Sequence, residues 1–240
     1  MNRKFYIKML PIYLIVILSL IGIAFGGNRT MSVVSENAPL KERQCIVIDA
    51  GHGGIDGGAV SCTGVLESQI NLEIALKLND LFHLLGIKTK MIRTTDCSIY
   101  TQGNTIASQK ISDLKERVRI TNSTENGILI SLHQNNFIQA QYRGAQVFYA
   151  QTKGSAEFAK QLQSSFVEYL NTGSNRKIKK SNCVYLMDHI TCTGVLVECG
   201  FLSNPEEEAM LRNTDYQQKI CCVIASAYSN YSNLTLKSAA

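Results

Sequence analysis

The sequence lacks an excess of charge of either sign once its first residues are set aside. It holds 24 lysines and arginines against 19 aspartates and glutamates. Four basic residues, Arg3, Lys4, Lys8 and Arg29, stand in an N-terminal stretch without acidic residues, and the remaining 20 basic residues balance the 19 acidic ones. Proteins that bind nucleic acid carry a basic patch, often interleaved with aromatic residues. The charge pattern therefore argues against DNA or RNA as a partner, and we expect no nucleic acid.

Closely spaced cysteine pairs and internal repeats are also missing. The eight cysteines include no C-x-x-C pair, and Cys221 and Cys222 are adjacent on a predicted helix. Exported domains that depend on disulfides are usually small and rich in cysteine, so the cysteine pattern of this larger domain does not indicate a disulfide framework. With 45% hydrophobic and 18% charged residues, the chain has the composition of one ordinary globular domain that can bury a core.

The N-terminus has the features of an export signal. A basic start is followed by an apolar run over residues 9–25 and then by two glycines. The run is close to the minimum of about 17 residues that spans a bilayer, so both a cleaved signal and an uncleaved anchor fit it. We expect residues 1–27 to be a signal peptide or N-terminal membrane anchor, residues 28–43 a tether, and residues 44–233 a folded domain that works outside the cytoplasm.

Hydrophobic periodicity predicts strands that alternate with helices. The predicted strands cover residues 45–49, 87–92, 127–132, 144–149, 183–186 and 195–197. The predicted helices cover residues 67–85, 113–121 capped by Ser112, 156–170 capped by Ser155, a segment beginning at Pro205, and 215–231. Such alternation is typical of α/β proteins. We predict a single α/β domain with a mostly parallel twisted sheet flanked by helices on both faces.

Polar residues stand at the downstream ends of three predicted strands. His52 follows CIVIDAG, His133 ends GILISLH and Glu198 ends GVLVE. The carboxyl ends of parallel strands face one crevice, which is where ligands bind. Glu67, in the first turn of the helix after the His52 loop, is expected to fold back over the same crevice.

Two histidines and a carboxylate are the ligand set of a catalytic zinc site, which keeps an open position for water and uses a separate base. We therefore predict one Zn²⁺ per domain, bound by His52, Glu67 and His133. Glu198 is the predicted catalytic base.

Four motifs, taken in order, resemble those of a known family. DAGHGGIDGGA, GVLESQINL, SLHQN and VLVECGFLSNPEE are similar to the motifs of the zinc-dependent N-acetylmuramoyl-L-alanine amidases of amidase type 3, and the resemblance covers residues 45–231. In that family, the residues at the positions of His52, Glu67 and His133 bind zinc and the residue at the position of Glu198 is catalytic. The resemblance implies the same site as the strand ends.

The resemblance also implies a substrate and a location. The substrate would be peptidoglycan, cleaved at the amide between the lactyl group of muramic acid and L-alanine of the stem peptide. A catalytic domain with an export leader and no wall-binding repeats is most similar to the spore-cortex amidases, which implies a role in cortex maturation before germination. The chain would act at the cell wall, at the outer face of the membrane or in the space between forespore and mother cell, where a regulatory or activator protein outside the membrane can reach it.

Smaller roles fall to residues around these motifs. Gln134, Asn135 and Asn136 follow the third motif's histidine and are expected to hydrogen-bond sugar or peptide groups. The glycines of the first motif are expected to let a bulky glycan approach the metal. His83 is interpreted as an ordinary, partly buried side chain, and His189 as a residue that reaches the crevice rim.

The chain departs from the family's pattern at two places. Gln134 stands where the family usually has alanine, and Thr193 and Gly194 stand where it usually has a proline shortly before the last strand. Neither change removes a ligand. Both positions are expected to line the substrate groove, so they bear on fine specificity.

Three alternatives stay open. The first is a general vegetative autolysin with the same chemistry. The second is a cell-wall cysteine peptidase using Cys62 or Cys199 with a histidine, although Cys199 is adjacent to Glu198 on a strand and should face the opposite side of the sheet. The third is a wall-binding or scaffold protein with a structural zinc, although an open three-ligand set beside Glu198 argues against that.

Overall fold

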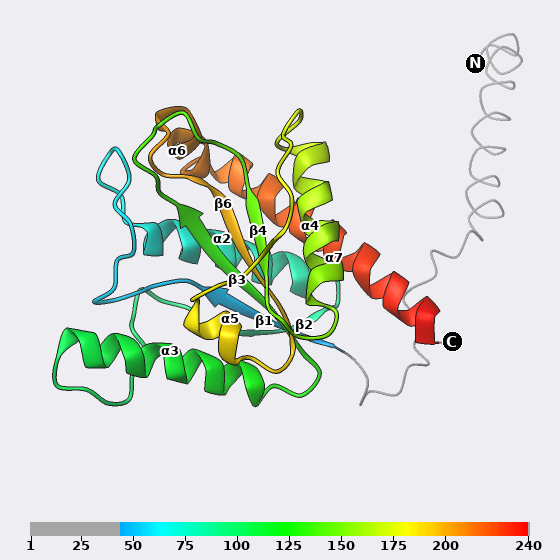
Figure 1. Ribbon diagram of the computed structural model, residues 1–240, viewed down its shortest axis with the longest axis horizontal. Coiled ribbons are helices and arrows are strands. Elements are labelled where there is room, and N and C mark those ends of the chain that lie inside the picture. The colour runs from blue at the N-terminus through cyan, green and yellow to red at the C-terminus, as the bar shows by residue number, and fades with distance from the viewer. Residues whose placement is uncertain (1–43, 240) are drawn as a thin grey trace, which may run out of the picture. The chain divides into compact units, whose positions relative to one another are not determined.

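The computed structural model describes residues 44–239, so the predicted leader (1–27) and tether (28–43) lie outside the described residues. Six strands form one sheet in the order β2-β1-β3-β6-β4-β5 (Figure 1). The strands are β1 (Cys45–Ala50), β2 (Lys88–Met91), β3 (Gly127–Asn135), β4 (Gln146–Tyr149), β5 (Lys179–Lys180) and β6 (Thr193–Phe201). The helices are α2 (Glu67–Leu84), α3 (Ile106–Asn122), α4 (Ser155–Tyr169), α5 (Tyr185–His189), α6 (Pro205–Leu211) and α7 (Thr214–Ala239).

The sheet is mostly parallel, as predicted. β1 pairs in parallel with β2 and β3, β3 with β6, and β4 with β5. The exception is β4, which runs antiparallel to β6. Every residue of β1 is buried, which explains why this strand reads as an almost continuous apolar run: strands inside a parallel sheet are covered on both faces.

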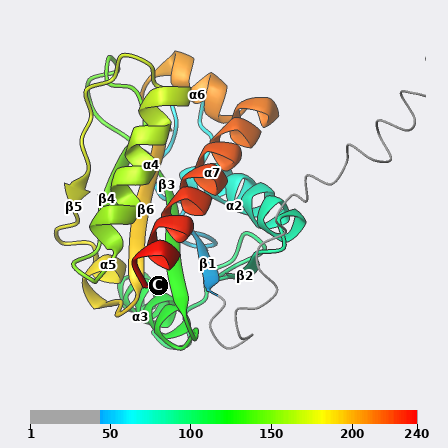
Figure 2. The same cartoon turned by 90° about the vertical axis from the view of Figure 1, so that its right-hand side faces the viewer.

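Helices cover both faces of the sheet, which confirms the predicted fold class. α2, α4 and α7 lie on one face, with α7 in contact with both of its neighbours (Figure 2). Alternate strand residues such as Ile46 and Ile48 join them in one buried cluster. On the other face, Val47, Leu129 and Leu196 pack against α5 and α3 in a second cluster. Among residues 44–239, no helix is both long and apolar enough to cross a membrane.

The prediction for α3 was wrong at its start. The helix begins at Ile106, and its N-cap is Thr105, whose side chain accepts a hydrogen bond from the Ser108 N–H while Ser108 bonds back to the cap. Ser112, the predicted cap, lies inside the helix. Its hydroxyl accepts hydrogen bonds from the N–H groups of Thr101 and Gln102 and so fastens the preceding loop to the helix.

The predicted strand over residues 183–186 was also wrong. Cys183 is exposed and has a φ of 62°, a left-handed conformation that no strand residue adopts, and α5 begins two residues later. Cys183 is therefore not the buried apolar residue that its predicted strand implied. Ser155 is the first residue of α4 and Gly154 is its cap, while the Ser155 hydroxyl accepts from the Gly194 N–H.

A buried ion pair ties α3 to the carboxyl end of β1. Asp49 and Arg117 are 1% and 3% exposed, and the Arg117 guanidinium bonds the Asp49 carboxylate. The Ser131 hydroxyl donates to the other Asp49 oxygen at 2.7 Å, and Asp113 accepts from Arg117 Nε at 2.6 Å. Burial alone would raise the pKa of Asp49, but the adjacent guanidinium lowers it below its ordinary value.

We expect Arg117→Met to lower the free energy of unfolding by about 3–5 kcal/mol, because it leaves the Asp49 charge buried without a partner. Urea denaturation measures the change. Arg119→Gln is the matched control, since Arg119 is exposed on the same helix and pairs only with the nearby Glu116; it should leave the midpoint unchanged. A loss below 1 kcal/mol for Arg117→Met would contradict this account of the pair.

Candidate metal and catalytic site

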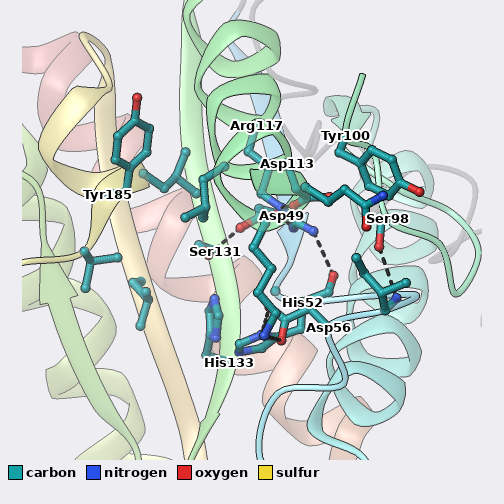
Figure 3. Close-up of a pocket in the computed structure, with 18 of the residues that line it drawn as sticks. Asp49, His52, Asp56, Ser98, Tyr100, Asp113, Arg117, Ser131, His133 and Tyr185 are labelled. Carbon is teal, nitrogen blue, oxygen red and sulfur yellow. Dashed lines mark hydrogen bonds and ion pairs between the residues drawn. The ribbon is translucent and has the colours of Figure 1, made fainter. Parts of the chain in front are cut away.

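The loop after β1 carries His52 in a strained but well-supported backbone. His52 has a φ of 61°, and the carbonyl oxygens of residues 50–52 turn toward two buried arginines. Arg93 donates to the carbonyls of Ala50 and Gly51, and Arg117 donates to that of Ala50. Arg117 also donates to the carbonyl of His52 (Figure 3). Buried carbonyls need donors, and the two guanidinium groups provide them, so the turn holds its shape and directs the His52 ring into the site.

The Glu67 carboxylate lies between the two histidines. Its Oε2 lies 3.2 Å from His52 Nε2 and its Oε1 lies 3.0 Å from His133 Nδ1. Each oxygen also accepts a backbone hydrogen bond, Oε2 from Ala59 at 3.0 Å and Oε1 from Gln134 at 3.1 Å. Glu67 is the first residue of α2 and is 4% exposed. These contacts fix one carboxylate in one orientation against two imidazole rings.

The structure brings the three predicted ligands together. One ligand atom from each of His52, Glu67 and His133 lies within 4.8 Å of the others. The His₂Glu donor set with neutral nitrogens and one carboxylate is suited to zinc. Asp56 Oδ2 bonds His52 Nδ1 at 2.9 Å and Lys110 Nζ bonds Asp56 Oδ1 at 2.8 Å, so His52 Nε2 is left facing the site.

Two glycines of the first motif are needed for the packing of the predicted ligands. A Cβ on Gly51 would lie 2.3 Å from the His133 ring, and one on Gly58 would lie 2.6 Å from Glu67 Oε2 and 2.7 Å from His52 Cδ2. The space that the missing side chains leave is filled by the site's own residues. Gly51 and Gly58 therefore let the predicted ligands pack closely.

Glu198 lies beside the three ligands but makes none of their contacts. It pairs with His133 across β3 and β6, so the two side chains share a face of the sheet. Its Oε2 is buried and has no hydrogen-bond partner among the described residues. Burial raises the pKa of Glu198 from 4.5 to about 7. A carboxyl group that titrates near neutrality can both accept and donate a proton at the pH of the reaction.

In the metal-free protein, the surroundings of Glu67 and His52 favour their charged forms, whereas those of Glu198 favour its neutral form. Although burial disfavours its charge, the two histidines hold the pKa of Glu67 well below its ordinary value. Burial lowers the pKa of His52, but its bonds to Glu67 and Asp56 outweigh this and raise it to about 9. A metal ion held by His52 would therefore have to displace a proton from it, and its affinity would fall as the pH is lowered below about 9.

Two expectations about the substrate groove are corrected. Gln134 is 3% exposed and its amide donates to Asn71 Oδ1 at 3.1 Å, so a substrate cannot reach it. Thr193 and Gly194 stand at the opposite end of β6 from Glu198, and Gly194 is covered by Ile190. Alternation along the strand explains the first result, because the residue after a crevice-facing histidine must face the other way.

The remaining polar candidates differ in whether they lie where a substrate can reach them. Asn136 is exposed and Asn135 half-buried at the end of β3, where a substrate can reach both. His83 is exposed and bonds Thr89 Oγ1 at 2.6 Å, far along α2 from Glu67. His189 ends α5 and stacks on Tyr185 with ring centroids 4.0 Å apart, and it does not line the cavity beside the ligands.

Neither candidate cysteine has the environment of a nucleophile. Cys199 is buried in the apolar cluster on the face opposite Glu198, as its neighbouring position predicts, and burial raises the pKa of its thiol. Cys62 is exposed in the loop before α2, where its N–H bonds the Leu202 carbonyl at 3.2 Å. The contacts of both residues favour a metal-based reaction over a cysteine peptidase.

Sequence reasoning missed the residues that support the ligands. Arg93, Arg117 and Asp56 hold the His52 loop, and Asn71 donates to both the Gly51 carbonyl and Glu67 Oε1. One signal was available. An aspartate inside a buried strand, as at position 49, requires a cationic partner, and Arg117 is that partner.

Comparison with known proteins now identifies the family. A family model described as N-acetylmuramoyl-L-alanine amidase matches residues 46–230. The chain belongs to the N-acetylmuramoyl-L-alanine amidase family. It is therefore a peptidoglycan amidase, a hydrolase of the amide between the N-acetylmuramoyl group and L-alanine.

Individual amidases are similar over most of their length. The germination-specific N-acetylmuramoyl-L-alanine amidase of Bacillus subtilis (strain 168) is 33% identical, over 90% of this chain and 90% of the relative. The CwlD amidase of Clostridioides difficile, solved in complex with the GerS lipoprotein, is 35% identical with a TM-score of 0.77, over 80% of this chain and 100% of that one. An N-acetylmuramoyl-L-alanine amidase from Clostridium difficile 630 is 29% identical with a TM-score of 0.69, over 80% of this chain and 98% of that one.

In this amidase, we expect Glu198→Gln to stabilise the metal-free protein more at pH 8 than at pH 5, by about 2 kcal/mol. The Glu198 pKa is raised on folding, so ionising the group costs stability as the pH rises from 4.5 toward 7; glutamine removes that cost. Urea denaturation with a chelator present measures both values. Glu206→Gln, on an exposed side chain, controls for the loss of one negative charge, and an equal gain from Glu198→Gln at both pH values would contradict the prediction.

Proposed function

We propose that this amidase is zinc-dependent, with His52, Glu67 and His133 as the ligands and Glu198 as the catalytic base. The observation that carries the proposal is the convergence of the three ligand atoms within 4.8 Å, with Glu198 in register beside His133. Bound zinc polarises the scissile carbonyl and lowers the pKa of water to about 7. Product analysis on purified peptidoglycan tests the reaction: stem peptides with a free L-alanine amino group should be released.

Three side chains of the protein carry the remaining roles in the proposed reaction. Asp56 holds His52 in the tautomer that presents Nε2, and Glu67 contributes the negative charge of the ligand set. Glu198 accepts a proton from the attacking water and gives it to the departing L-alanine nitrogen. Among the described residues, its buried Oε2 has no hydrogen-bond partner that would have to be given up, which favours this transfer.

The proposed substrate is the peptidoglycan of the spore cortex, in a modification needed for germination. The germination-specific relative, alike over nine-tenths of both chains, supports this role. We infer that the chain is exported and acts at the cell wall or the outer face of a membrane, as such a substrate requires. A regulatory lipoprotein is part of the proposal, since the CwlD amidase was solved with one.

A vegetative autolysin is the second candidate. The LytC amidase of Bacillus subtilis (strain 168) is 27% identical, but this chain covers only 35% of that relative. Comparing hydrolysis rates on purified cortex and on vegetative wall separates the two roles. Equal rates on both substrates, in the absence of any partner protein, would argue against the cortex role and against a required lipoprotein.

Glu198→Gln should keep zinc but lower turnover by about 10²–10⁴-fold, because glutamine has the shape of the base and cannot take a proton. Elemental analysis gives the zinc content, and release of stem peptides gives the rate. Near-normal hydrolysis would assign the proton transfer to another group. Loss of zinc together with activity would move Glu198 into the ligand shell.

Asp56→Asn should weaken zinc binding about 10–100-fold, the usual effect of losing the carboxylate that orients a ligand histidine. Competition with a chelator measures the affinity without using catalysis. Asp96→Asn is the matched control, since Asp96 accepts from the Gly54 N–H in the same loop at 2.9 Å but does not bond His52. Equal losses in both variants would show that Asp56 only supports the loop.

A further inference from the structure

A buried pair of amide side chains lies behind the predicted ligands, on the side of β3 that faces α2. Gln134 Nε2 donates to Asn71 Oδ1 at 3.1 Å, and the two residues are 3% and 0% exposed. Gln134 is also one of the positions at which the sequence departs from the family's pattern. Because a substrate can reach neither side chain, any effect of the pair on the reaction must pass through the residues that it contacts.

The pair contacts all three segments that carry the predicted ligands. Asn71 Nδ2 donates to the Gly51 carbonyl at 3.2 Å and to Glu67 Oε1 at 3.3 Å. Gly51 directly precedes the first ligand histidine, and Gln134 directly follows the second. One run of hydrogen bonds therefore joins the loop after β1, the first turn of α2 and the end of β3.

The Asn71 amide supports Glu67 in only one of its two orientations. Its N–H groups must point to the Gly51 carbonyl and to the Glu67 carboxylate, so its oxygen points the other way and is buried. Buried carbonyl oxygens need a donor, and Gln134 Nε2 provides it. If the amide turned round, its oxygen would lie against the Glu67 carboxylate, so the donor from Gln134 holds the amide in the supporting orientation.

Stability alone does not explain a glutamine at position 134. Its own side-chain oxygen, Oε1, is buried and has no hydrogen-bond partner among residues 44–239. An unpaired buried carbonyl lowers the stability of a fold, a cost that an apolar side chain of the same length would avoid. The feature that such a side chain would lack is the donor to Asn71.

We propose that Gln134 and Asn71 are positioning residues: together they fix Glu67 relative to the loop after β1 and the end of β3, and so set the affinity of the site for zinc. The proposal rests on the proposed function only for the identity of the ligands. Contacts that orient the ligands of a metal typically change its affinity by about 10–100-fold when they are lost.

The test measures the Zn²⁺ affinity of the full chain by competition with a chelator. Gln134→Met keeps the length of the side chain and removes its amide, so it should weaken zinc binding by about tenfold or more, while the urea midpoint of the metal-free protein stays close to that of the parent. Gln134→Asn is the second variant in case the first does not fold. Its amide is one methylene too short to reach Asn71, so it should show the same loss of zinc affinity.

Gln217→Met is the matched control. Gln217 is 0% exposed, its Oε1 also lacks a partner among the described residues, and its amide donates to Glu73 of α2 at 2.8 Å. The same chemical change is thus made at a buried amide that contacts α2 but bonds none of the predicted ligands. It should leave the zinc affinity unchanged. A loss equal to that of Gln134→Met would show a general effect of buried amides and would overturn the proposal.

A double-mutant cycle tests the route through Asn71. Asn71→Ala should also weaken zinc binding, and adding Gln134→Met to it should change the affinity by less than about twofold, because residues that act through one shared contact are not additive. Losses that multiply in the double variant would overturn the route through Asn71. Unchanged zinc affinity in both Gln134→Met and Gln134→Asn would overturn the proposal as a whole.

The measurements distinguish this inference from the proposed function. Zinc binding that is tight in the parent and insensitive to the change at Gln134 would overturn the inference and leave the proposed hydrolysis intact. A parent that binds zinc, binds it more weakly as Gln134→Met, and yet releases no stem peptides from peptidoglycan would support the inference and contradict the proposed reaction.

Discussion

The candidate metal site depends on two buried guanidinium groups that fix the backbone after β1. Arg93 and Arg117 donate to the carbonyl oxygens of residues 50–52, which a left-handed His52 turns inward. Without these donors the carbonyls would be buried and unpaired, a cost that a short glycine-rich turn cannot offset by itself. The planar fork of arginine suits this task because one side chain can bond several carbonyls at fixed angles. The position of the His52 ring follows from this support.

Two carboxylates in one site acquire opposite properties from their surroundings. Glu67 accepts hydrogen bonds from Ala59, Asn71 and Gln134 and lies against both histidines, so its charged form is favoured. Glu198 has a buried oxygen with no hydrogen-bond partner within residues 44–239, and its pKa is raised to about 7. Environments that push two acids apart in this way separate a permanently ionised group from a proton carrier. The same functional group, carried by α2 in Glu67 and by β6 in Glu198, thus supports a ligand role for the first residue and a base role for the second.

The sheet, and the meeting of four site residues at one of its edges, could be predicted from the sequence because the patterns that indicate them are local. An apolar run that ends in a polar residue is visible in a few letters, and parallel strands send their ends to the same side. The features that could not be predicted depend on contacts between residues that lie far apart in the sequence. Arg117 lies 68 positions from Asp49; the aspartate in a buried strand indicates that a cationic partner is needed, but nothing near it indicates which residue that is. Gln134 was expected to contact the substrate because it directly follows His133, but adjacent residues of a strand face opposite sides, and Gln134 points inward toward α2.

The position of the site is set by the point at which the hydrogen bonds between β1 and β3 end. The Gly51 N–H makes the last bond from this chain segment to β3, to the Leu132 carbonyl at 3.0 Å. Two residues further on, the N–H of Gln134 points to the same side of β3, where β1 has already turned away, so no strand is there to accept it. Glu67 Oε1 accepts this hydrogen bond instead. A strand end thus supplies a free backbone donor beside His133, and a carboxylate placed there by α2 both satisfies the donor and becomes fixed as the centre of the ligand set.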